Sequence, residues 1–571
     1  MYLVNYLYLR RKKRKRLRSK VFEFLKKYFS ILDMLVCIIL AFLFAVSPLY
    51  QNDFEYILRW NIHILSRFLV CLIVFPICTI CIRMVIEKIA VKEEKSKLDK
   101  LFESKYSMIV IALILLICWL PVIGILYPGS LNNDGWGQIK QVDYQLYTNQ
   151  HPMFDTLVMA GSIYHLAHLW NGKWQLAIFT YTIVQTIIMS FVLAYTLTYS
   201  KKKLKINSKI LVCFLMIYGL LPIFPGTVQA ISKDTLFSWA YVLFLINFLE
   251  MIRTKMTCLE KKRNIIYTII ISVLCVFTKR IGIYVVLASF LILLLMNIKS
   301  WKNISFIVLV MFAFMIFLDI INQYFSIFHI LKIGKEGKYS LFFQHTARYS
   351  KYYESEVTQE EKDIINKVLK YDTLVENYNP LNSDTLIDNH VRGSSSQDYA
   401  EWLKVWMHQG LKHPKVYIEA TLAMTSGWFS TKEFKPLMNM DWHDQLDKDI
   451  IPEETTKRPQ VNRNLANWLQ KKYDELAKIP IVDILLSFGF IASLLPAFLW
   501  TTTIKYRKNN ENQKVWLGVF PTLISIALGC WLAPVSESTE GIRYLYPIVF
   551  TNIMLILWCI YCVKENKKVK L

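Results

Sequence analysis

The chain has 571 residues, of which 54% are hydrophobic, and its 67 Lys and Arg against 43 Asp and Glu give a formal net charge of +24. Charged residues make up 19% of the chain, against roughly 25% in a soluble domain, and the mean hydropathy is +0.32. This composition excludes disordered, collagen-like and disulfide-scaffold proteins. Because the apolar residues fall in blocks of about 20, the length that a bilayer core requires, the sequence predicts a polytopic membrane protein.

Twelve apolar segments predict transmembrane helices, since a helix satisfies its backbone hydrogen bonds within the segment. They lie at residues 31–50, 65–87, 108–127, 176–198, 210–225, 235–252, 265–277, 281–297, 304–325, 481–503, 515–533 and 544–562. Only Thr278-Lys279-Arg280 separates the seventh segment from the eighth, and the two could form one over-long helix or two short ones. Counting two helices places every short basic loop on one side, as the positive-inside rule requires. The predicted fold is therefore all-α and polytopic, with about twelve transmembrane helices and both termini cytoplasmic.

Basic residues concentrate in short runs beside the predicted spans, as at 10–20, 201–205 and 564–570. Such runs also occur in proteins that bind nucleic acid. Next to a span, however, a basic run acts as an orientation signal that lies on anionic lipid. The sequence therefore predicts the lipid bilayer, and no nucleic acid, as a partner. No small-residue cleavage pattern follows 31–50, so no cleavable signal peptide is expected.

The predicted spans divide the chain into five regions. These are a basic cytoplasmic N-terminus at 1–30, transmembrane helices 1–9 at 31–325 with a large outer loop at 128–175, an extracytoplasmic helical domain at 326–480, transmembrane helices 10–12 at 481–562, and a cytoplasmic tail at 563–571. None of the eleven cysteines lies in the 326–480 region. A large outside domain without a disulfide favours the cell membrane of a Gram-positive bacterium over a eukaryotic lumen.

The outer loop at 128–175 contains the first candidate for chemistry. Pro128-Gly129 ends the preceding helix, and Asn132-Asn133-Asp134-Gly135 has the composition of a tight turn. The turn places the Asp134 carboxylate near the outer membrane boundary, where partial desolvation would raise its pKa and suit it to general base catalysis. Alternatively, Asp134 caps an amphipathic helix at 135–146. A second amphipathic stretch begins at His151-Pro152.

Further charged residues fall at the outer ends of predicted helices. Lys233-Asp234 opens the sixth span, Lys279-Arg280 forms the tip between the seventh and eighth, and Arg543 opens the last. Each alone is typical of a membrane anchor. Together, cations at one face suit a phosphate or pyrophosphate group, and a nearby acid suits a base or a metal ligand. The acids predicted at this face are Asp134, Asp234, Glu537 and Glu540.

The 326–480 region is predicted to be helical, with a strong apolar stripe in 400–411 and an apolar stretch at 413–430 that suits the membrane interface. The stripe is most simply a packing surface against the membrane part. The alternative is a sugar-binding groove built from Trp402, Trp406 and Trp428, because sugars stack on aromatic rings.

Several motifs together resemble the GT-C superfamily of integral-membrane glycosyltransferases, and more narrowly a branch of Gram-positive bacterial polytopic membrane proteins within it. They are YPGSLNNDGWGQ with HPMFDTL in the first large outer loop, SKDTLF, TKRIGIY, WLKVWMHQGLKHPKVYIEATLAMTSGWF and RYLYPIVF. They spread from about residue 127 to residue 550, so the resemblance covers most of the chain.

The resemblance implies transfer of a sugar from a polyprenyl-phosphate donor, with inversion at the anomeric carbon, to a hydroxyl of an envelope polymer or glycolipid at the outer face. Asp134 matches the catalytic acidic residue of the first outer loop and would act as the general base. Asp234 matches a second acid that positions substrate or helps to bind a divalent metal, Mg²⁺ or Mn²⁺. Arg280 and Arg543 would contact the donor phosphate. The complete predicted substrate-binding set is His151, Lys233, Asp234, Lys279, Arg280, Arg543 and Tyr544.

The sequence departs from the usual pattern in two respects. Two extra spans precede the Asp134 loop, which usually follows the first helix. The turn also has a single acidic residue instead of an acidic pair, which argues against a metal.

Two other functions fit the same spans. A transporter or flippase for lipid-linked saccharides would bind at the bilayer midplane with buried charges. The mid-span acids are few, chiefly Asp33 and Asp319, while polar residues gather at one face, which favours surface chemistry. The third reading is a non-catalytic protein of envelope assembly.

Overall fold

The computed structural model describes residues 20–570 except 21, 54–55, 60, 91–95, 132, 149–150, 297–300, 325–335, 432–457, 510–513 and 533–541. Over these residues the protein is helical, with one pair of two-residue strands. Each of the twelve predicted apolar segments contains a helix. These are α2 (Ile31–Asn52), α3 (Ile62–Ile89), α5 (Ser107–Ile125), α9 (Trp174–Lys202), α10 (Ser208–Leu220), α12 (Lys233–Arg253), α13 (Lys262–Thr278), α14 (Ile281–Met296), α15 (Trp301–Tyr324), α24 (Leu495–Lys505), α25 (Phe520–Leu532) and α27 (Tyr546–Lys570).

Six helices in the described part of the chain are long and apolar enough to cross a membrane, or seven if α23 (Pro480–Leu486) and the helical stretch Phe490–Lys505, bent by 56°, form one span. The protein is therefore an all-α membrane protein. The count of twelve spans and the cytoplasmic placement of the termini stay predictions. The chain does break at Lys279-Arg280, between α13 and α14, so the seventh and eighth segments are two separate helices.

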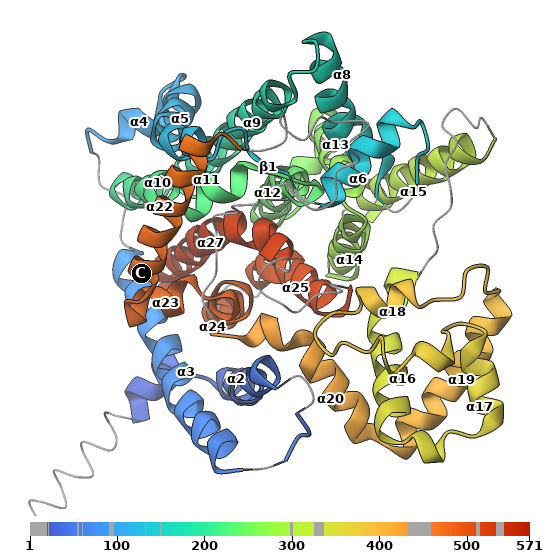
Figure 1. Ribbon diagram of the computed structural model, residues 1–571. Coiled ribbons are helices and arrows are strands. Elements are labelled where there is room, and N and C mark those ends of the chain that lie inside the picture. The colour runs from blue at the N-terminus through green and yellow to red at the C-terminus, as the bar shows by residue number, and fades with distance from the viewer. Residues whose placement is uncertain are drawn as a thin grey trace, which may run out of the picture.

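The centre of the molecule is α27, red in Figure 1, which packs against α12 and α24. Its apolar residues face all directions, and a helix of that kind is stable when it is enclosed on all sides. Trp558 is fully buried and donates from Nε1 to the Val515 carbonyl at 2.8 Å. The enclosed α12 and α27 form the rigid frame on which the charged residues at their ends are held.

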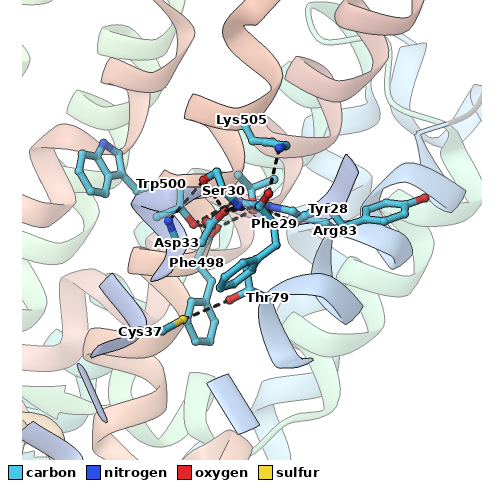
Figure 2. Close-up of polar contacts among 12 residues, drawn as sticks. Tyr28, Phe29, Ser30, Asp33, Cys37, Thr79, Arg83, Phe498, Trp500 and Lys505 are labelled. Carbon is cyan, nitrogen blue, oxygen red and sulfur yellow. Dashed lines mark hydrogen bonds and ion pairs between the residues drawn. The ribbon is translucent and has the colours of Figure 1, made fainter. Parts of the chain in front are cut away.

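The first two spans are fastened by a buried ion pair (Figure 2). The Arg83 guanidinium of α3 donates to both Asp33 oxygens of α2, at 2.6 and 2.7 Å, and both side chains are fully buried. Arg83 also donates to Thr501 and Thr502 of α24. Asp33 lies in the first turn of α2, where it forms a capping box with Ser30. The expectation of a mid-span acid at Asp33 was therefore wrong, because Asp33 caps a helix end and neutralises an arginine.

A separate group of helices, yellow to orange in Figure 1, comprises α16 (Ser340–Tyr352), α17 (Gln359–Asn366), α18 (Asp384–Asp388), α19 (Ser396–Lys412) and α20 (Pro414–Thr425). Trp402 and Trp428 are 0% and 2% exposed, so they serve as packing residues and leave no ring face for a sugar. The next described helix, α22 (Gln460–Ala477), packs against α5 instead, at the other side of the molecule. The predicted 326–480 region therefore has two parts with different neighbours.

Candidate functional site

Two short strands bring the two charged loops together. β1 (Ser130–Leu131) and β2 (Ala230–Ile231) pair in parallel, with Ser130 opposite Ala230 and Leu131 opposite Ile231. Each strand leads directly into a helix, β1 into α6 (Asn133–Asp143) and β2 into α12. Because the strands are parallel and in register, the first turns of α6 and α12 start side by side. Asp134 and Lys233-Asp234 lie in these first turns.

Gly129 makes the close approach of β1 to α9 feasible. Its φ is +116°, and a Cβ at this position would collide with the Thr182 Oγ1 atom of α9. Thr182 in turn donates to the Pro128 carbonyl at 3.1 Å, and Gln185 Nε2 donates to the Ala230 carbonyl at 3.1 Å. The side chains of α9 thus hold both strands in place.

Asp134 is the centre of a four-residue network. Its Oδ2 atom accepts from Lys233 Nζ at 2.9 Å and from Arg543 Nη1 at 2.7 Å. Lys233 Nζ also lies 2.8 Å from His151 Nδ1. The side chains of Lys233, Arg543 and Asp134 are 18%, 12% and 30% exposed, so solvent and small groups can still reach the carboxylate.

A second ion pair, between Asp234 and Lys279, lies beside the Asp134 network, because Asp234 follows Lys233 in the sequence. Lys279 binds the Asp234 carboxylate, which is 1% exposed, and its ammonium lies 4.5 Å from the centroid of the Tyr544 ring. The next residue, Arg280, is exposed and has no ion-pair partner among the described residues. The N-terminal cap of α12 is Ser232, and Asp234 lies in the first turn.

The electrostatics of Asp134 and His151 differ from the expectation. Burial alone would raise the pKa of the Asp134 carboxyl, but the charges of Lys233 and Arg543 outweigh it and hold that pKa well below its usual value. The predicted raised pKa of Asp134 was therefore wrong. Burial, followed by the nearby Lys233 ammonium, lowers the pKa of His151 to about 3. His151 is neutral at physiological pH and accepts a hydrogen bond from the Lys233 ammonium at Nδ1.

A third carboxyl of the site, Asp155, was missed by the sequence analysis. It is fully buried at the end of α7 (Met153–Asp155), and its Oδ2 accepts from Gln138 Nε2 of α6 at 2.7 Å. Its Oδ1 has no hydrogen-bond partner in the described part of the chain. Burial raises the pKa of Asp155 to about 7. An acid inside the apolar stretch MFDTLVMAG was the signal, since such a residue is costly unless it has a role.

The structure thus brings the described residues of the predicted site together at one end of α12 and α27, with Arg280 next to Lys279. Asp134, His151, Lys233 and Arg543 form one network, and Asp234, Lys279 and Tyr544 form the second. Glu537, Glu540 and Asn132 lie outside the described residues, and so does the side chain of Asp319.

The carboxylates of the site do not fit a divalent metal as they are placed. Asp134 is bound by two cations and Asp234 by one, and a metal ion would have to displace them. No group of three or more His, Cys, Asp or Glu side chains with a geometry for a metal occurs within the described ranges.

Comparison with known proteins gives a family for the chain. A family profile described as a family of unknown function (DUF6020) matches residues 142–570. The chain belongs to this family. The match includes every predicted site residue except Asp134, which lies eight positions before its start. Comparison with curated proteins and with solved structures returned no match.

Proposed function

We propose that the protein is an inverting membrane glycosyltransferase of the GT-C type. It would transfer a sugar from a polyprenyl-phosphate donor to a hydroxyl of a cell-envelope polymer or glycolipid, at the extracytoplasmic face of the cell membrane. The observation that carries this proposal is the Asp134 network, in which cations from α12 and the start of the last span converge on one partly exposed carboxylate.

The charge balance of the site suits an anionic donor. Four cations stand against two carboxylates, and His151 is neutral. The four are Lys233, Lys279, Arg280 and Arg543. Arg280 is exposed and open to a phosphate, whereas Lys233 and Arg543 already hold an anionic oxygen that a phosphate oxygen resembles. The donor phosphate would bind Arg280 and compete with Asp134 for the other two cations.

This competition gives Asp134 a route to act as a base. When the phosphate draws Lys233 and Arg543 away, the two charges that lower the pKa of Asp134 weaken, and that pKa rises. Asp134 then accepts the proton of the acceptor hydroxyl as the new bond from the acceptor oxygen to the anomeric carbon forms. The bond from that carbon to the phosphate oxygen breaks, and the cations hold the charge on the leaving phosphate.

The direct test is Asp134→Asn, assayed for sugar transfer from polyprenyl-phosphate sugars in membrane vesicles. Removal of a general base predicts a fall in rate of about 10²- to 10⁴-fold. The matched control is Asp143→Asn, in the last turn of the same helix, which should transfer at the wild-type rate. Wild-type transfer by a folded Asp134→Asn variant would disprove the role of Asp134. The same assay with and without EDTA tests dependence on Mg²⁺ or Mn²⁺.

Neither alternative has a specific supporting contact among the described residues. A transporter or flippase for lipid-linked saccharides needs unpaired charges near the midplane, and Asp33 is instead paired with Arg83 at a helix end. A non-catalytic role in envelope assembly would leave the Asp134 network without a task. Absence of transfer, with measurable flipping of a labelled lipid-linked sugar, would favour the transporter.

A further inference from the structure

A cavity of about 300 Å³ lies between α5 and α9, away from the candidate site. Three lysines line it, Lys105 from the segment before α5 and Lys202 and Lys203 from the end of α9. Tyr195 and Tyr199 of α9 also line it. A cavity with three ammonium groups and a phenolic wall is suited to an anionic head group.

The length of α12 indicates at which side of the membrane the cavity lies. This helix has Lys233 of the candidate site in its first turn, and near its other end Glu250 accepts from the hydroxyl of Tyr199 at 2.8 Å. At 1.5 Å per residue, the helix between these two positions spans roughly 25 Å. The hydrocarbon core of a bilayer is about 30 Å thick. The cavity therefore lies at the membrane boundary opposite the candidate site.

The neighbouring lysines of α9 have different environments. Lys201 is fully buried and binds Asp99 at 2.8 Å, so its charge is compensated. Lys202 and Lys203 are exposed, and neither has an ion-pair partner among the described residues. Glu250, which accepts from the cavity-lining Tyr199, is bound by Arg253 at 2.7 Å, which neutralises it, and Glu103 lies 3.7 Å from Lys201. The cavity thus keeps an excess of positive charge.

The protein surface next to the cavity is apolar. Met108 of α5 lines the cavity and is 40% exposed. Further along the same helix, Ile109, Leu113, Ile117 and Leu120 are 48–67% exposed. Acyl chains can pack against this face of α5 while the head group of the same molecule occupies the cavity.

From these observations we propose that the cavity binds the phosphate head group of an anionic glycerophospholipid from the leaflet opposite the candidate site. The three lysines bind the phosphate as point charges, and the exposed face of α5 holds the acyl chains. A zwitterionic lipid is disfavoured, because its cationic group would face the lysines. The proposal is independent of the proposed enzymatic function.

The test compares two triple variants of the full chain in vesicles with equal amounts of phosphatidylglycerol and phosphatidylcholine. In Lys105→Gln/Lys202→Gln/Lys203→Gln the cavity loses its charge. In Lys255→Gln/Lys261→Gln/Lys262→Gln three exposed lysines near the adjoining ends of α12 and α13 are removed. Lipid retained on the released protein is counted by native mass spectrometry, and circular dichroism verifies folding.

Wild type and the control should retain phosphatidylglycerol over phosphatidylcholine, and the cavity variant should lose this preference by about tenfold or more. Equal retention by the cavity variant and wild type would overturn the proposal, as would an equal loss in the control. Displacement of the lipid by inorganic phosphate alone would point to a site for soluble anions and overturn it too. If the triple variant does not fold, the single change Lys203→Glu is used with the same criteria.

Discussion

Two carboxyls of the candidate site lie in opposite environments, although both are on or next to α6. Asp134 is partly exposed and bound by two cations, while Asp155 is fully buried and receives one neutral amide hydrogen bond. Asp134 is therefore charged at neutral pH, and the neutral acid of Asp155 is favoured up to about pH 7. Two carboxyls with pKa values shifted in opposite directions are common in active sites, where the two groups have different roles. Below about pH 7, Asp155 is therefore mostly neutral and repels an anionic donor less than an ionised carboxylate would.

The raised pKa of Asp155 predicts a pH-dependent stability. The value is about 7 in the folded protein and about 3.9 in an unfolded chain, so the folded state binds more protons between these values. Stability should therefore fall as the pH rises from 4 to 7, by on the order of 4 kcal/mol in total at about 1.4 kcal/mol per pKa unit. Asp155→Asn cannot ionise and should lose this part of the slope. Apparent melting temperatures in detergent at pH 5, 6.5 and 8 measure the dependence of stability on pH. Identical slopes for Asp155→Asn and wild type would refute the raised pKa of Asp155.

At the scale of elements, the sequence predicted where helices lie because runs of apolar residues are a local signal. The break at Lys279-Arg280 and the starts of α12 and of the last span follow from local polarity in the same way. The pairing of β1 with β2 could not be predicted, because two residues form each strand and about a hundred residues separate them. Sequence position likewise placed Asp134 and Arg543 at one face, but their direct contact depends on packing.

A substitution at Gly129 tests whether strand β1 aligns the site. Its φ of +116° and the contact of an added Cβ with Thr182 Oγ1 predict that Gly129→Ala destabilises the protein by about 1–3 kcal/mol. It should also reduce sugar transfer, because the start of α6 would shift. The matched control is Gly137→Ala within α6, where an added Cβ meets no atom within 4 Å. Since alanine favours a helix, the control should be neutral or stabilised by up to about 1 kcal/mol. Equal melting temperatures for both variants would contradict the role of Gly129.

For the whole molecule, the loop between α2 and α3 connects the helices of residues 340–425 to the membrane part. The Arg348 guanidinium of α16 binds Glu419 of α20 at 3.1 Å, and both are buried. Arg348 also donates to the Tyr56 carbonyl, and Glu419 accepts from the Leu58 amide, both in the loop between α2 and α3. One buried ion pair thus holds three segments together. The loop between α2 and α3 thus has a structural role as an attachment point for α16 and α20.

Loss of one partner of this pair should weaken the whole assembly. Glu419→Gln leaves Arg348 buried without its counter-charge, which costs about 3–5 kcal/mol. We expect a lower melting temperature and faster cleavage by protease in limited proteolysis. Lys415→Gln is the control. Lys415 is 56% exposed and lies 3.9 Å from Glu419, and an exposed ion pair of this kind contributes about 0–1 kcal/mol to stability. If the two variants unfold at the same temperature, the buried pair is not the link between these segments.

The contact between Arg543 and Asp134 also has a consequence for biosynthesis. The two residues are 409 positions apart, and Arg543 precedes α27, which follows every other described helix along the chain. As the ribosome delivers the chain to the membrane, Asp134 and Lys233 emerge long before the arginine that completes their network. A nascent or prematurely terminated chain therefore carries an incomplete site, and the site is completed only when translation reaches the last helix.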